Sequence, residues 1–135
     1  GDELALGYRR SAYRENGCLI TSLTLCLTPG EPDVIRGKME ELINRRKAKQ
    51  PLEFPSAGST FKRPEGDYAG ALIEECGLKG RAVGGAQVSE KHAGFVINRG
   101  NAASADILAL IRLVQETVLR EKGVRLEPEV RFLGF

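Results

Sequence analysis

Apolar and weakly polar residues alternate most regularly near the start of the chain, over residues 18–28. Leu23, Leu25 and Leu27 take every second position there, and the residues between them are small. Both faces of such a strand can be covered by other parts of a protein. The pattern therefore predicts a largely buried β-strand, which the Pro-Gly pair at 29–30 ends.

Helices are predicted where apolar residues recur every three or four positions. The first begins near Pro32, a residue that suits the first helical turn. A short helix follows over residues 68–76, with Asp67 as its cap. The last begins at Ser104 and ends before Gly123. The apolar stripes of the two longer helices consist of Ile35, Met39, Leu42 and Ile43, and of Ile107, Ile111, Val114 and Val118.

Shorter apolar runs predict the remaining strands. Residues 81–83 and 93–97 form two of them, and 126–133 alternates in the manner of a third. Pro128 confines that last strand to an edge or to a position whose amide is not used. Residues 50–66 predict a structured loop with at most one short strand. The resulting fold class is α+β, with helices packed on a small mixed sheet.

Composition excludes several classes of protein. The 135 residues suit one domain, and 41% hydrophobic with 28% charged residues is ordinary globular composition. A net charge of +2 gives no argument for nucleic acid, and no apolar stretch is long enough to cross a membrane. The three cysteines, Cys18, Cys26 and Cys76, have no zinc-type or CxxC spacing. We therefore expect reduced thiols and a cytoplasmic location.

Residues 55–64, Pro-Ser-Ala-Gly-Ser-Thr-Phe-Lys-Arg-Pro, carry the chemistry that the sequence suggests first. Ser59 follows a glycine, so a ligand can approach its backbone closely, and Lys62 and Arg63 bring positive charge nearby. A plain turn would have the same composition. The basic residues 45–49 are explained equally by the negative end of a helix. The charged side chains at 127, 129 and 131 are explained by a solvated strand face.

Longer motifs identify a known family. The chain resembles the C-terminal portion of UDP-N-acetylenolpyruvoylglucosamine reductase, in the family's shorter type, over nearly its whole length. The shared motifs, in chain order, are Gly-Tyr-Arg-Arg-Ser (7–11), Arg-Arg-Lys (45–47), Gln-Pro (50–51), Ser-Ala-Gly-Ser-Thr-Phe-Lys-Arg-Pro (56–64), Ala-Gly-Ala-Leu-Ile (69–73), Gly-Gly-Ala-Gln-Val-Ser (84–89), His-Ala-Gly-Phe-Val-Ile-Asn (92–98) and Glu-Pro-Glu-Val-Arg-Phe-Leu-Gly (127–134).

The resemblance implies three catalytic positions. Arg9 faces the substrate carboxylate, Ser59 is the general acid, and Glu129 stabilises the enol-like intermediate together with the arginine. Charge develops on the carboxylate when hydride reaches the enolpyruvyl double bond, so these residue types suit the chemistry. The neighbouring carbon then needs a proton from a positioned donor.

The resemblance also implies binding positions and cofactors. Lys47 and Arg63 match positions that contact the nucleotide diphosphate, and His92 matches one that touches the substrate. Tyr8 is placed near the flavin. The implied substrate is UDP-N-acetylglucosamine enolpyruvate, reduced to UDP-N-acetylmuramate for peptidoglycan with FAD and NADPH. The residues themselves leave packing as the alternative for Tyr8 and a surface or capping role for His92.

The family's N-terminal flavin-binding region is not in this sequence, so we read the chain as a fragment. We assign residues 1–50 to the end of the FAD-binding domain and 51–135 to the substrate-binding domain. We expect the chain alone neither to bind FAD tightly nor to turn over, with Arg9 displaced and 18–28 open to self-association. Two other classes stay open: a non-enzymatic nucleotide-sugar or anion-binding module, and a structural α+β interaction domain.

Overall fold

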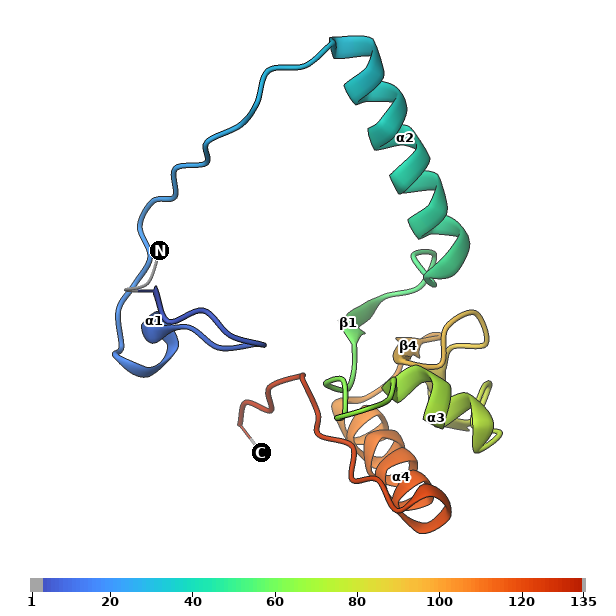
Figure 1. Cartoon of the computed structure of the whole chain (residues 1–135). Coiled ribbons are helices and arrows are strands. Elements are labelled where there is room, and N and C mark those ends of the chain that lie inside the picture. The colour runs from blue at the N-terminus through green and yellow to red at the C-terminus, as the bar shows by residue number, and fades with distance from the viewer. Residues whose placement is uncertain (1–3, 135) are drawn as a thin grey trace. The chain divides into compact units, whose positions relative to one another are not determined.

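Four short antiparallel strands and two helices form the core of the protein (Figure 1). The computed structural model describes residues 4–134 and divides the chain into two compact units, Gly1–Ile35 and Arg36–Phe135. We describe each unit by itself.

The first unit has little regular structure. Gly7 and Arg10 exchange backbone hydrogen bonds of 3.0 and 3.1 Å around a tight turn, and helix α1 (Ala12–Glu15) follows. Residues 18–28 form no strand, and every side chain there is exposed. The predicted buried strand is therefore wrong, because the described part of this unit offers no strand to pair with it.

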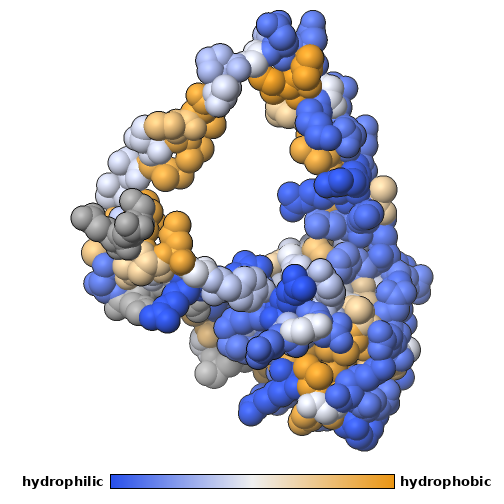
Figure 2. Space-filling view, viewed as in Figure 1, coloured by the Kyte–Doolittle hydropathy of each residue, from blue (hydrophilic) through white to orange (hydrophobic). Residues whose placement is uncertain are grey.

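Helix α2 (Pro32–Lys49) begins at the predicted proline, carries Asp33 in its first turn and ends in basic residues. These charges complement the helix dipole. None of its residues is buried, so the predicted apolar stripe, Ile35, Met39, Leu42 and Ile43, is exposed (Figure 2).

The sheet has the strand order β1-β4-β3-β2. Its strands are β1 (Ser56–Ser59), β2 (Ala82–Val83), β3 (Ala86–Val88) and β4 (Phe95–Asn98). The α+β class is confirmed, but all three strand pairings are antiparallel, so the sheet is not mixed. Strand β3 was not predicted, because the glycines before it suggested a loop. The predicted strand at 126–133 is reduced to one isolated bridge, between Phe61 and Pro128.

Helix α4 (Ser104–Lys122) packs against β2, β3 and β4, and α3 (Ala69–Glu75) packs against α4. The predicted apolar face of α4 supplies fully buried side chains, among them Val114 and Val118. Gly123 ends α4 in the left-handed conformation at φ +70°. The caps lie one residue from the predicted ones, at Tyr68 and Ala103. The Asp106 carboxylate accepts the Ala103 N–H at 3.0 Å.

Candidate functional site

Ser59 lies at a bulge in strand β1. Ser56 lies opposite Ile97 and Ser59 lies opposite Phe95, so three steps along β1 match two steps along β4. Gly58 occupies the bulge at φ +85°, a backbone conformation that favours glycine. A bulge redirects the side chains that follow it, and here it leaves Ser59 exposed at the end of the strand.

Glu129 is brought to the same place by the C-terminal segment. The Glu129 N–H donates to the Thr60 carbonyl at 2.8 Å, and the Lys62 N–H donates to the Glu127 carbonyl at 2.8 Å. Pro128 lies between these two bonds, opposite Phe61, where its missing N–H costs nothing. Glu129 is thus paired with the residue after Ser59. That the two side chains flank a substrate group stays a prediction.

His92 is held in one orientation. Its Nδ1 accepts the Gly94 N–H at 3.1 Å, and its ring meets Phe95 edge-on at 5.0 Å. A Cβ added to Gly70 or Gly94 would come within 3.2 or 3.1 Å of the ring, so both glycines leave room for it. Because Nδ1 accepts, the hydrogen of the neutral ring belongs on Nε2. His92 is therefore an oriented donor rather than a loose surface residue.

The predicted cations differ in their surroundings. Lys62 forms an ion pair with Glu127. Arg63 donates from Nε to the Asp67 carbonyl at 3.2 Å, and its guanidinium lies 3.9 Å from the centre of the Tyr68 ring. Lys47 is exposed in the last turn of α2. The diphosphate contacts assigned to Lys47 and Arg63 stay predictions.

Tyr8 and Arg9 lie in the first unit, at the tip of the turn between Gly7 and Arg10. Arg9 has φ +56°, an uncommon value for a residue with a side chain, and such outliers concentrate at functional positions. Its guanidinium lies 5.8 Å from the centre of the Tyr8 ring. The predicted meeting of Arg9 with Ser59 and Glu129 stays a prediction.

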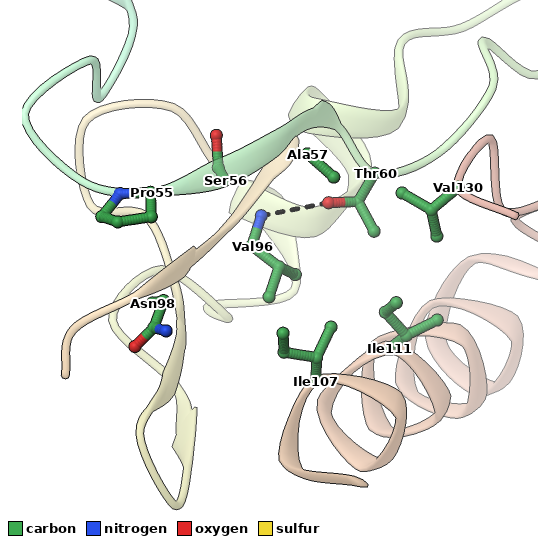
Figure 3. A pocket seen from close by; sticks show the side chains of 9 residues that line it. All are labelled: Pro55, Ser56, Ala57, Thr60, Val96, Asn98, Ile107, Ile111 and Val130. Atoms are coloured by element: carbon green, nitrogen blue, oxygen red, sulfur yellow. Dashed lines mark hydrogen bonds between the residues drawn. The ribbon is translucent and has the colours of Figure 1, made fainter. Parts of the chain in front are cut away.

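A cavity of about 330 Å³ lies beside β1 on the side of α4 (Figure 3). Thr60, Val96, Ile107, Ile111 and Val130 contribute most of the apolar groups drawn around it, and Ser56 and Asn98 lie at its polar end. Ser59 and Glu129 are not among its lining residues, although their neighbours Thr60 and Val130 are. Part of the cavity wall thus comes from the two segments that carry the predicted catalytic residues, and β4 and α4 supply the rest.

Thr60 is a residue that the sequence reasoning missed. It is 3% exposed, and its hydroxyl accepts the Val96 N–H at 3.0 Å. A threonine directly after a Gly-Ser pair was the available signal, but its side chain could be assigned to a turn equally well.

The Gly84-Gly85 pair does not form a cradle for the phosphates of a flavin dinucleotide. A Cβ on Gly84 would lie 2.4 Å from Asp106 Cγ in the first turn of α4, and a Cβ on Gly85 would lie 2.3 Å from the Gly100 carbonyl oxygen. The Asp106 carboxylate already accepts the Gly85 and Ala103 N–H groups at that helix end. A phosphate would be repelled there.

Residues 4–134 hold neither a candidate metal site nor a membrane-spanning helix. No group of three or more His, Cys, Asp or Glu residues in this range could hold a metal ion. No helix in this part of the chain has the length and apolar character to cross a membrane.

Two curated proteins similar to this chain have the same name. It is 59% identical over 133 residues to the UDP-N-acetylenolpyruvoylglucosamine reductase of Agathobacter rectalis, a match that covers 98% of this chain and 42% of that protein. The reductase of the same name from Clostridium botulinum strain Alaska E43 is 55% identical, with 98% and 44% covered. The chain thus spans less than half the length of these curated relatives.

A solved structure agrees. The crystal structure of UDP-N-acetylenolpyruvylglucosamine reductase (MurB) from Thermus caldophilus superposes with a TM-score of 0.78 at 39% identity, covering 96% of this chain and 46% of that one. A model of the reductase's C-terminal domain matches residues 50–133, the part of the chain that holds the sheet, Ser59 and Glu129. This chain therefore belongs to the UDP-N-acetylenolpyruvoylglucosamine reductase C-terminal domain family.

Proposed function

We propose that this chain is the substrate-binding part of a reductase that converts UDP-N-acetylglucosamine enolpyruvate to UDP-N-acetylmuramate for peptidoglycan synthesis. The observation that carries the proposal is the pairing of Thr60 with Glu129 at 2.8 Å, directly after the bulge that presents Ser59. A hydroxyl and a carboxyl group on two neighbouring backbone segments can face one reacting group from two sides.

The proposed roles follow from the residue types. FAD, reduced by NADPH, supplies hydride to the terminal carbon of the enolpyruvyl group when it is bound in the complete reductase. Ser59 donates a proton to the adjacent carbon, with a water or a polar neighbour assisting because a serine hydroxyl is a weak acid. Arg9 stabilises the negative charge that develops on the substrate carboxylate, and Glu129, acting as a carboxylic acid, donates a hydrogen bond to it.

Binding residues complete the proposal. Lys47 and Arg63 contact the diphosphate, and His92 donates from Nε2 to a polar group of the substrate. Tyr8 lies near the flavin, which we propose is held mostly by regions of the relatives that this chain does not span. Residues 1–50 are proposed to complete that flavin-binding domain, and residues 51–135 to form the substrate-binding domain. The cytoplasmic location is part of the same proposal.

The anion-binding alternative has less support. Lys62 is paired with Glu127, whereas Lys47 and Arg63 are both exposed, so charge alone does not separate this module from the proposed substrate site. A module that binds phosphate by charge alone has no use for a bulged strand beside Glu129. Titrating the chain with UDP-N-acetylglucosamine and with inorganic phosphate, and following amide shifts by NMR, separates simple binding from the proposed role.

A chimera tests the function. This chain would replace the matching 133-residue segment of the Agathobacter rectalis reductase, to which it is 59% identical. We expect NADPH oxidation that depends on the enolpyruvyl substrate. Ser59→Ala should slow substrate reduction by about 10²–10⁴-fold and leave flavin reduction by NADPH nearly intact, because proton donation belongs to the second half-reaction only.

Stopped-flow absorbance of the flavin separates the two half-reactions. Ser104→Ala is the matched control, since it removes an exposed hydroxyl from the first turn of α4, away from the bulge. A folded chimera with flavin but without substrate-dependent turnover would rule out the proposed function. Equal losses in both half-reactions would rule out Ser59 as a dedicated proton donor.

A further inference from the structure

Because β1 is bulged, one backbone N–H of β4 needs an acceptor other than a β1 carbonyl, and the Thr60 side chain provides it. Val96 lies opposite the inserted residue, between the Ser59–Phe95 and Ser56–Ile97 pairs. In a regular antiparallel pair its N–H would donate to a backbone carbonyl of the neighbouring strand. Here it donates to Thr60 Oγ1 at 3.0 Å (Figure 3). A buried N–H without an acceptor is costly, so this hydroxyl has a defined task.

Thr60 also joins three segments through its backbone. Its N–H donates to the Gly94 carbonyl at 2.8 Å, and its carbonyl accepts the Glu129 N–H at 2.8 Å. The residue is 3% exposed and contacts the cavity between β1 and α4, which Val130 also lines. One buried residue therefore holds the strand position beside Ser59 through its hydroxyl and the position of Glu129 through its backbone carbonyl.

We infer that Thr60 is a positioning residue, whose hydroxyl holds Ser59 and Glu129 in register with each other. The expected effect of Thr60 on the reaction rate rests on the proposed function. Its structural content, coupling of the Val96 and Glu129 backbone positions through one residue, rests on the bond from Val96 to the Thr60 hydroxyl and the bond from Glu129 to the Thr60 carbonyl. Side chains that lock reacting groups within a fraction of an ångström have large effects on rate although they touch no substrate.

Amide hydrogen exchange of the whole chain tests the coupling. Thr60→Val keeps the shape of the side chain and removes the acceptor, and Thr60→Ser keeps the acceptor. We expect the valine variant to speed exchange of both the Val96 and the Glu129 N–H by about tenfold, and the serine variant to restore most of the protection.

Thr117→Val is the matched control. The Thr117 hydroxyl donates to the Leu113 carbonyl at 2.8 Å within α4 and is half-buried, so its removal makes the same chemical change away from the site. The exchange rates of the slowest core amides in each variant show any loss of global stability. If Glu129 is no less protected in Thr60→Val than in Thr117→Val, the inference is wrong.

A second comparison covers the case in which Thr60→Val does not fold. Thr60→Ser is then examined in urea below its unfolding transition, where Val96 and Glu129 must lose protection together. Loss at Val96 alone overturns the coupling.

Kinetics of the chimera test the catalytic part. Thr60→Val should lower the rate of substrate reduction about tenfold with KM and flavin reduction little changed, and Thr60→Ser should recover it. An active chimera in which Thr60→Val matches the unchanged protein contradicts the positioning role. A chimera inactive without any substitution contradicts the proposed function instead, and the exchange data still decide the coupling.

Discussion

Residues 18–28 and residues 86–98 both contain apolar runs that suit β-strands, and they are opposite in structure. Both are rich in apolar and β-branched residues. In the second region Val88 and Ile97 are at most 3% exposed, whereas Leu23 and Leu27 in the first are 77% and 83% exposed. The second region has neighbouring strands and α4 to cover it within its own unit.

The difference shows that an apolar segment folds as a strand only when its neighbours supply hydrogen bonds and a covering face. Residues 18–28 have the composition of a buried strand, but no described residue of the first unit pairs with them. Figure 2 shows the resulting apolar surface along the extended segment that precedes α2.

The largest expected difference is in stability. Leu110 is 0% exposed, so Leu110→Ala should lower the free energy of unfolding by about 2–5 kcal/mol through lost burial and a cavity. Leu23→Ala should change it by less than about 0.5 kcal/mol. Urea unfolding of the chain, followed by circular dichroism, gives both values. Similar losses in the two variants would mean that residues 18–28 are covered in solution.

Self-association is the next expected difference. An exposed apolar segment with unpaired backbone groups can pair with another copy, so we expect the chain to associate through residues 18–28. Changing Leu23 and Leu25 to lysine should shift light scattering toward the monomer. Leu119→Lys, at an exposed position of α4, is the control and should have little effect. A monodisperse monomer over a wide concentration range would contradict the expectation.

The thiols give the third contrast. Cys18 and Cys26 are exposed in the first unit, while Cys76 is half-buried at the end of α3. Burial raises the pKa of the Cys76 thiol, and the nearby Glu121 carboxylate raises it further. Less thiolate is therefore present at a given pH, and we expect Cys76 to react with a disulfide reagent at least about tenfold more slowly at pH 8.

The raised pKa of Cys76 also makes the stability of the chain depend on pH. The thiol of Cys76 contributes fully to the free energy of unfolding below its pKa in the unfolded chain, and this contribution is lost as the pH rises through its pKa in the folded chain. In urea, where the chain is unfolded, all three cysteines should react with the disulfide reagent at similar rates. Three equal rates in the folded chain would contradict the burial of Cys76.

The predictable parts of the fold were those set by local periodicity. Helix α4 was predicted within one residue at each end, because its apolar face repeats over five turns and Gly123 suits the left-handed end. Strand β3 was missed because the glycines before it read as a loop, whereas Gly85 is there to let the chain pass close to Gly100. Packing of that kind depends on residues distant in sequence.

Some residues of the candidate site could be predicted from the sequence, and others could not. Ser59, Glu129 and His92 could be proposed from motifs, but their residue types alone left turns and solvated faces as alternatives. Thr60 could not be proposed, since its importance comes from the bulge opposite Val96 and from the pairing with Glu129. Gly58 is a local sign of a bulge, but the residue of the partner strand that lies opposite it is set by parts of the chain distant in sequence.

The pairing of residues 60–62 with 127–129 has a consequence for folding. Its side-chain contact, Lys62 with Glu127, joins positions 65 residues apart, so the chain between them must be ordered first or closed as a large loop. Contacts of such separation are expected late in folding. We therefore expect a helix such as α4 to form early and the Ser59–Glu129 region to form last, which φ-values near zero for Val130→Ala would support and values near one would contradict.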